Sequence, residues 1–116
     1  MNTIQGSPTP IEKMLAGRLG ALAHPARLRI LQHLSGHPAC CCKEVVECLD
    51  LAQSTVSQHL KILVDAGLVI YRPERPRSVY QVDRAALAGL STSLAGLIEA
   101  CCAGEPQSCK DKNSGN

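Results

Sequence analysis

The sequence predicts a mainly α-helical fold of about five helices with one small β-hairpin. Apolar residues recur at spacings of three and four along most of the chain, as on the buried face of a helix. Two β-branched segments flank a turn rich in proline at residues 73–77. The chain contains no Phe or Trp, so its core must consist of Leu, Val, Ile and Ala. With 116 residues we expect one domain, whose small core would gain stability from dimerisation.

The first two helices are separated by His24 and Pro25. The first is expected to begin near Pro10, because its apolar stripe follows at spacings of four and three: Leu15, Leu19 and Leu22. Pro25 suits the first turn of the second helix, which should end at residues 35–36. We therefore expect a flexible tail at residues 1–10 and a single domain at residues 11–103.

A third helix and a fourth helix follow, joined by a short turn at residues 50–52. The third is expected over residues 39–49, with Val45, Cys48 and Leu49 turned inward. The fourth carries a stripe of Val56, Leu60 and Leu63. This pairing is typical of motifs that place their second helix in the major groove of DNA. The polar residues that we expect to contact base edges and phosphates are Gln53, Ser54, Thr55, Ser57, Gln58, His59 and Lys61.

The hairpin and the last helix complete the predicted fold. Strands are expected at residues 68–72 and 78–82, and Arg75 and Arg77 at the tip would lie along the phosphate backbone. Asp83 can cap the last helix, which repeats apolar residues in a pattern typical of a dimer seam: Leu87, Leu90, Leu94, Leu97 and Cys101. No unbroken apolar run approaches the roughly 20 residues of a membrane span, and the N-terminus does not resemble a signal peptide. We expect a cytoplasmic protein with a flexible tail at residues 104–116.

Seven cysteines stand out in so short a chain, and their odd number excludes a complete set of internal disulfides. In a reducing compartment such thiols are more often ligands or sensors. Thiolates prefer soft ions, which include trivalent arsenic and antimony, Cu(I), Cd(II), Pb(II) and Zn(II). The cysteines form two groups, of which the first is Cys40, Cys41, Cys42 and Cys48 and the second is Cys101, Cys102 and Cys109.

The C-terminal group is the preferred ligand site. Neighbouring helical residues point about 100° apart, so Cys101 and Cys102 converge on one ion only where the helix ends, which residues 103–104 permit. Cys109 would then return from the tail as the third ligand of a trigonal As(III). The alternative site is formed by Cys40, Cys41 and Cys42. Cys48 lies two turns further along the third helix, too far to bind the same ion, and is interpreted as a core residue. A site that shares sulfurs from both groups stays open.

Three segments of the chain resemble the ArsR/SmtB-type winged helix-turn-helix repressors of bacteria. They are LAHPARLRIL at residues 22–31, QSTVSQHLKIL at residues 53–63 and AGLV at residues 66–69, and the resemblance extends over roughly residues 11–100. It implies a homodimer, formed through the first and last helices, that binds double-stranded operator DNA and is released when an inducer binds. A common zinc site of this family uses Asp and His on the last helix. All four histidines of this chain precede the hairpin, so that site is absent.

The resulting hypothesis is a metalloid-responsive transcriptional repressor rather than an enzyme. Arsenite, antimonite or a methylated or organic arsenical would bind the thiolates of Cys101, Cys102 and Cys109 as inducer, and no cofactor is expected to be permanently bound. The main competing hypothesis is a repressor of the same fold that responds to thiol oxidation or to soft metals. A metalloid carrier without DNA binding is less favoured. A cysteine-based reductase is the least favoured, because no anion-binding loop surrounds any cysteine.

Overall fold

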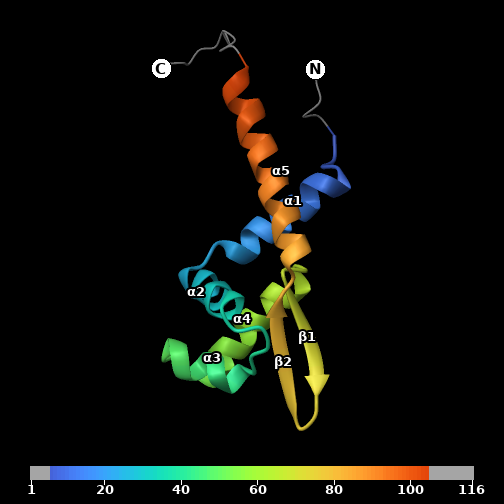
Figure 1. Ribbon diagram of the computed structural model, residues 1–116. Helices are drawn as coiled ribbons and strands as arrows, with labels where there is room; N and C mark the ends of the chain where they lie inside the picture. The colour runs from blue at the N-terminus through green and yellow to red at the C-terminus, as the bar shows by residue number, and fades with distance from the viewer. Residues whose placement is uncertain (1–5, 105–116) are drawn as a thin grey trace.

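The computed structural model describes residues 6–104 and confirms the predicted fold of five helices and a two-stranded antiparallel hairpin (Figure 1). The elements in chain order are α1 (Pro10–Leu22), α2 (Pro25–Ser35), α3 (Cys42–Leu49), α4 (Gln53–Asp65), β1 (Val69–Glu74), β2 (Arg77–Val82) and α5 (Arg84–Ala103). Helices α2, α3 and α4 pack together beside the hairpin, and α5 extends away from this group.

Helices α1 and α2 begin where local sequence signals predict. The Glu12 backbone N–H donates to Thr9 Oγ1 at 3.1 Å, and the Thr9 N–H donates to Glu12 Oε1 at 2.9 Å, which forms a capping box. His24 caps α2, since its Nδ1 accepts a hydrogen bond from the Ala26 N–H at 3.1 Å. Each helix has a proline in its first turn, where the missing N–H costs nothing.

Helix α3 begins at Cys42, three residues later than predicted. Cys40 instead forms an isolated antiparallel β-bridge with Tyr80 of β2, with N–O distances of 3.1 and 2.7 Å. Cys41 is the N-cap of α3. The segment that leads into α3 is therefore fixed to the hairpin by two backbone hydrogen bonds, which local periodicity could not indicate.

The core lies between α2, α3, α4 and the inner side of the hairpin. Its fully buried side chains include Ile30, Leu34, Val45, Val56, Leu60, Leu63, Leu68 and Val79. The strands pair from Val69↔Val82 to Glu74↔Arg77, so each strand reaches further toward the tip than predicted. The connecting turn is Arg75–Pro76.

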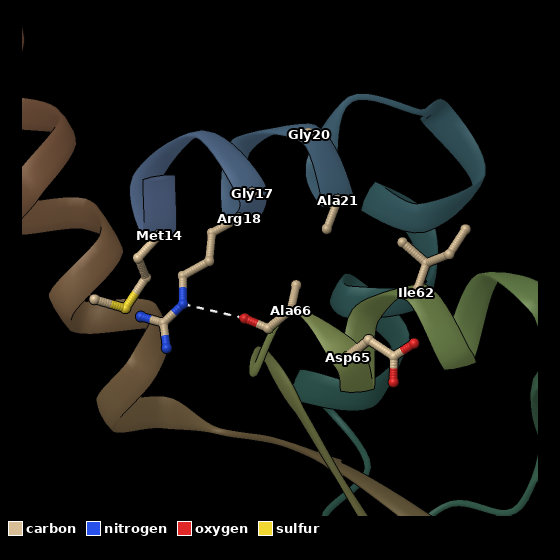
Figure 2. Close-up of a pocket in the computed structure, with 8 residues that line it drawn as sticks. All are labelled: Met14, Gly17, Arg18, Gly20, Ala21, Ile62, Asp65 and Ala66. Carbon is tan, nitrogen blue, oxygen red and sulfur yellow. Dashed lines mark hydrogen bonds between the residues drawn. The ribbon is translucent and has the colours of Figure 1, made fainter. Parts of the chain in front are cut away.

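Helix α1 lies against the C-terminal end of α4 (Figure 2). Arg18 Nε donates to the Ala66 carbonyl at 3.1 Å. Gly67 follows with a φ of +81°, and the Arg18 guanidinium approaches to 3.1 Å of the position that a Cβ would occupy there. Beside this contact, residues of both helices line an open pocket of about 550 Å³. The exposed side chains of Met14 and Ile62 are among them.

Helix α5 exposes most of its apolar surface in a single chain. Leu90 is the one buried residue between Arg84 and Ala103, whereas Leu97 and Ile98 are 49% and 51% exposed. By length and composition alone this 20-residue helix is apolar enough to cross a membrane. The sequence did not indicate this, because residues 91–93 are polar and divide the apolar residues of the helix into two short runs. The predicted dimer seam lies on the same helix, and a second copy packed against that seam would cover these side chains.

Candidate nucleic-acid interface and cysteine sites

Helix α4, which we call the reading helix, has one buried and one exposed side. Val56, Leu60 and Leu63 are fully buried and hold the helix against the core. The structure brings most of the predicted DNA-contacting residues together on the exposed side: Gln53, Ser54, Thr55, Ser57, Gln58 and Lys61. Lys61 Nζ lies 3.2 Å from the Asp65 carboxylate, an exposed pair one turn along the helix.

His59 does not belong to this exposed side. Its side chain points toward α2 and is 9% exposed, and Arg27 Nη1 donates to its Nδ1 at 3.1 Å. Burial lowers the pKa of His59, and the nearby His24 and Arg27 lower it further. The structure therefore does not support the prediction that His59 contacts DNA. The sequence held the relevant signal, since His59 follows Val56 by three residues and precedes Leu63 by four.

The hairpin presents its two predicted phosphate contacts in different settings. Arg75 and Arg77 are both exposed, and Arg75 lies in the turn. Arg77 is the first residue of β2, and its Nη1 donates to Cys41 Sγ at 3.9 Å. The hairpin and the N-terminus of α3 thus meet through a guanidinium and a thiol.

The three consecutive cysteines have different environments. Cys40 is buried, and its Sγ lies 3.3 Å from His33 Nε2. Burial raises the pKa of the Cys40 thiol to about 12, and a hydrogen bond to Glu44 contributes in the same direction. Because metal ligation requires the thiolate, Cys40 is poorly suited to be a ligand. Cys40 and Cys42 therefore lie in different environments, the first buried and the second half-buried.

Cys41 and Cys42 are half-buried and contact the two elements predicted to bind DNA. Cys41 is adjacent to Arg77 of the hairpin, and Cys42 Sγ lies 3.6 Å from Ser57 Oγ of the reading helix. Cys48 is exposed, so its interpretation as a core residue is wrong. Cys48 lies on the side of this short helix that faces solvent, and Val45 is the one residue of α3 that is fully buried.

Cys101 and Cys102 lie exposed in the last turn of α5, which ends at Ala103. Cys109 lies outside the described residues. Across residues 6–104, no three His, Cys, Asp or Glu side chains are grouped closely enough to hold a metal ion. The structure thus shows two neighbouring, accessible thiols at this end of α5 and leaves the complete ligand set a prediction.

Comparison with known proteins identifies the family. A model described as a helix-turn-helix domain matches residues 22–72. The chain is 42% identical over 74 residues to the HTH-type transcriptional regulator Rv2034 of Mycobacterium tuberculosis, a match that covers 64% of this chain and 68% of that protein. It is 35% identical over 82 residues to the arsenical resistance operon repressor of Staphylococcus xylosus, covering 71% and 78% of the two chains. The chain belongs to the ArsR family of winged helix-turn-helix transcriptional regulators.

Solved ArsR-like structures share this fold. An ArsR-like regulator from Rhodococcus sp. RHA1 superposes with a TM-score of 0.70 at 21% identity, over 77% of this chain and 83% of that one. The relatives are named as transcriptional regulators and not as enzymes, which confirms the prediction of a non-enzymatic function. In the terms of this family, α3 and α4 are the helix-turn-helix and β1 with β2 is the wing.

Proposed function

We propose that this ArsR-family regulator is a repressor that binds operator DNA as a homodimer in the cytoplasm and is released when trivalent arsenic binds its cysteine thiolates. The observation that carries the DNA-binding part is the two-sided reading helix. Its polar side chains are exposed, as are the two arginines of the wing, while its apolar side is fixed in the core. The arsenical resistance repressors among its relatives support the choice of inducer.

The N-terminus of the reading helix suits contact with a phosphate. Ala52 is the N-cap residue and makes no side-chain hydrogen bond to the first turn. The first backbone N–H groups of α4 are therefore available to an anion, and the helix dipole favours negative charge at this end. A phosphate bound there would place Gln53 and Ser54 at the edge of the major groove, with Ser57 and Gln58 one turn further along.

The dimer is proposed from the apolar surface that α1 and α5 leave exposed. Ile11 and Met14 of α1 are more than half exposed, and Leu97 and Ile98 of α5 are about half exposed. Burial of such side chains stabilises a dimer by roughly 25 cal/mol for each Å² of apolar surface removed from water. Two reading helices on one dimer would contact successive major grooves, as two-fold helix-turn-helix proteins do.

Cys101 and Cys102 are the proposed inducer ligands, with Cys109 as third ligand. Both thiols are accessible and lie in the last turn of α5, where a loosening of that turn would let the two side chains converge on one ion. Because Cys101 continues the apolar seam, arsenic binding would change the packing of the two α5 helices. A hundredfold loss of operator affinity needs a coupling free energy of about 2.7 kcal/mol, which is within the usual allosteric range.

A second candidate is a sensor formed by Cys41 and Cys42, responding to soft metals or to oxidation. The observation that favours it is the contact of these thiols with Arg77 of the wing and Ser57 of the reading helix. A ligand or an oxidised sulfur at this position would disturb both DNA-binding elements directly, with no change at the dimer seam.

A titration of DNA binding separates these proposals. Fluorescence anisotropy with promoter DNA would be followed while arsenite, methylarsenite, zinc or peroxide is added to wild type, to C101S/C102S, to C41S/C42S and to C48S as the matched exposed control. The proposal expects arsenite to release wild type, C41S/C42S and C48S but not C101S/C102S. The reverse pattern assigns sensing to Cys41 and Cys42, and release by peroxide alone indicates a redox sensor. A chain that never retains DNA contradicts the repressor function and favours a metalloid carrier.

A further inference from the structure

A cluster of three residues around the buried His59 connects the reading helix to the junction between α1 and α2. His59 of α4 accepts a hydrogen bond from Arg27 of α2. The Arg27 Nε also donates to the Ala21 carbonyl near the end of α1, at 2.6 Å. One guanidinium therefore contacts α1 and α4 at the same time, from its own position in the first turn of α2.

His24 completes this cluster. Its ring centroid lies 4.6 Å from that of His59, with an angle of 55° between the ring planes. The His24 Nδ1 is engaged as the cap of α2, so the ring is held in place beside His59. The charged and titratable groups that face His59 are then His24 and Arg27, and neither is an acid.

This arrangement requires a neutral His59. Nδ1 can accept from the guanidinium only while it carries no proton, and a protonated ring would place a second positive charge 3.1 Å from Arg27. The lowered pKa of His59 agrees with this geometry. Protonation would remove the hydrogen bond and add repulsion across the contact between α2 and α4.

We propose that His59 is a positioning residue for DNA recognition, which fixes the reading helix through Arg27 and releases it when its ring is protonated. This inference rests on the proposed function only in that α4 is the helix that contacts DNA. It predicts a pH dependence of DNA affinity opposite to the one expected of a histidine that contacts DNA directly. A histidine at the DNA surface binds phosphates better when protonated, whereas protonation of His59 is expected to weaken DNA binding.

The test compares three variants at about pH 7.5 and about pH 5, the lower value being chosen because the pKa of His59 lies below that of an ordinary histidine. H59Q keeps an acceptor for Arg27 but does not titrate, H59L removes the acceptor, and H37Q removes an exposed histidine of the loop after α2 as a control. Wild type and H37Q should lose about tenfold in DNA affinity at the lower pH, a change equivalent to one pKa unit. H59Q should match wild type at the higher pH and lose little at the lower one, whereas H59L should bind weakly at both.

A thermodynamic cycle keeps the inference testable where DNA binding fails. Unfolding of wild type, R27M, H59L and the double variant would be followed by circular dichroism at the higher pH. The positioning role expects the double variant to be hardly less stable than either single variant, because the two residues act through one contact. Additive losses, equal pH profiles for wild type and H59Q, or stronger DNA binding of wild type at the lower pH would each overturn it. If wild type, H59Q, H59L and H37Q all fail to bind DNA while the unfolding data still show coupling between Arg27 and His59, the proposed function is contradicted and this contact is not.

Discussion

The reading helix and the C-terminal half of α5 both carry apolar residues at helical spacing, yet a single chain holds them very differently. In α4 the apolar stripe of Val56, Leu60 and Leu63 is fully buried, and Arg27 anchors the helix to its neighbours. In α5 the corresponding residues beyond Leu90 are largely exposed, and the helix extends away from the core (Figure 1). The orientation of the reading helix is thus determined within one chain, whereas most of the apolar surface of α5 beyond Leu90 stays exposed in a single chain.

The largest effect on stability is expected in α4. Truncation of Leu60 to alanine leaves a cavity in the core and should lower the free energy of unfolding by about 2–5 kcal/mol. The same truncation at Ile98, which is half exposed, should change the stability of a dilute, monomeric sample by less than about 0.5 kcal/mol. Chemical denaturation monitored by circular dichroism gives both values. Equal losses at the two positions would mean that α5 is as fully packed as α4.

The next effect concerns DNA affinity. L97E places a charge in the proposed dimer seam and should yield a folded monomer whose operator affinity is reduced by about a hundredfold or more, roughly 2.7 kcal/mol. Analytical ultracentrifugation measures the mass, and anisotropy measures the affinity. L28E is the matched control, because Leu28 is similarly exposed but lies on α2. A dimeric L97E protein with normal affinity would contradict the role of α5.

The buried thiol of Cys40 should make the protein sensitive to alkali. Its pKa is raised in the folded state to about 12, so its contribution to stability is complete below the ordinary thiol pKa and is lost as the pH rises from there toward 12. C40A should therefore lose less stability than wild type between about pH 8 and pH 10. Thermal unfolding across this range measures the difference. In the native protein, iodoacetamide should modify Cys48 before Cys40, and rapid labelling of Cys40 would contradict its burial.

The smallest effect is expected at the wing. R77A removes one proposed phosphate contact and should lower the slope of log affinity against log salt by about one, with a modest loss of affinity that does not depend on sequence. K61A should behave similarly. Its loss of stability should stay below about 1 kcal/mol, because the exposed pair with Asp65 contributes little. An unchanged salt slope in R77A would place the wing away from the phosphates.

Most of the fold could be predicted because its signals are local. The proline and capping residues that define α1 and α2 lie within a few positions of the helix ends, and Asp83 caps α5 as expected. The start of α3 could not be predicted, because it depends on a hydrogen-bonded pair between residues 40 positions apart, Cys40 and Tyr80.

In the candidate site, too, the features set by local sequence could be predicted and those set by long-range contacts could not. The exposed polar face of the reading helix follows from its 3.6-residue period, and so does the inward position of His59 once Val56 and Leu63 are assigned to the core. The environments of the thiols do not follow from spacing. Cys40 and Cys48 exchange the roles expected of them, because the β-bridge turns Cys40 into the core while Cys48 lies on the exposed side of α3.

The bridge between Cys40 and Tyr80 also limits how this molecule can move. The chain before α3 acts as a one-residue third strand of the wing sheet, so the wing cannot tilt independently of the helix-turn-helix without losing two backbone hydrogen bonds. In the proposed dimer, each chain would therefore present its wing and its reading helix to DNA together. An inducer that acts through α5 would then change the distance between the two reading helices, and with it the half-site spacing that the dimer fits.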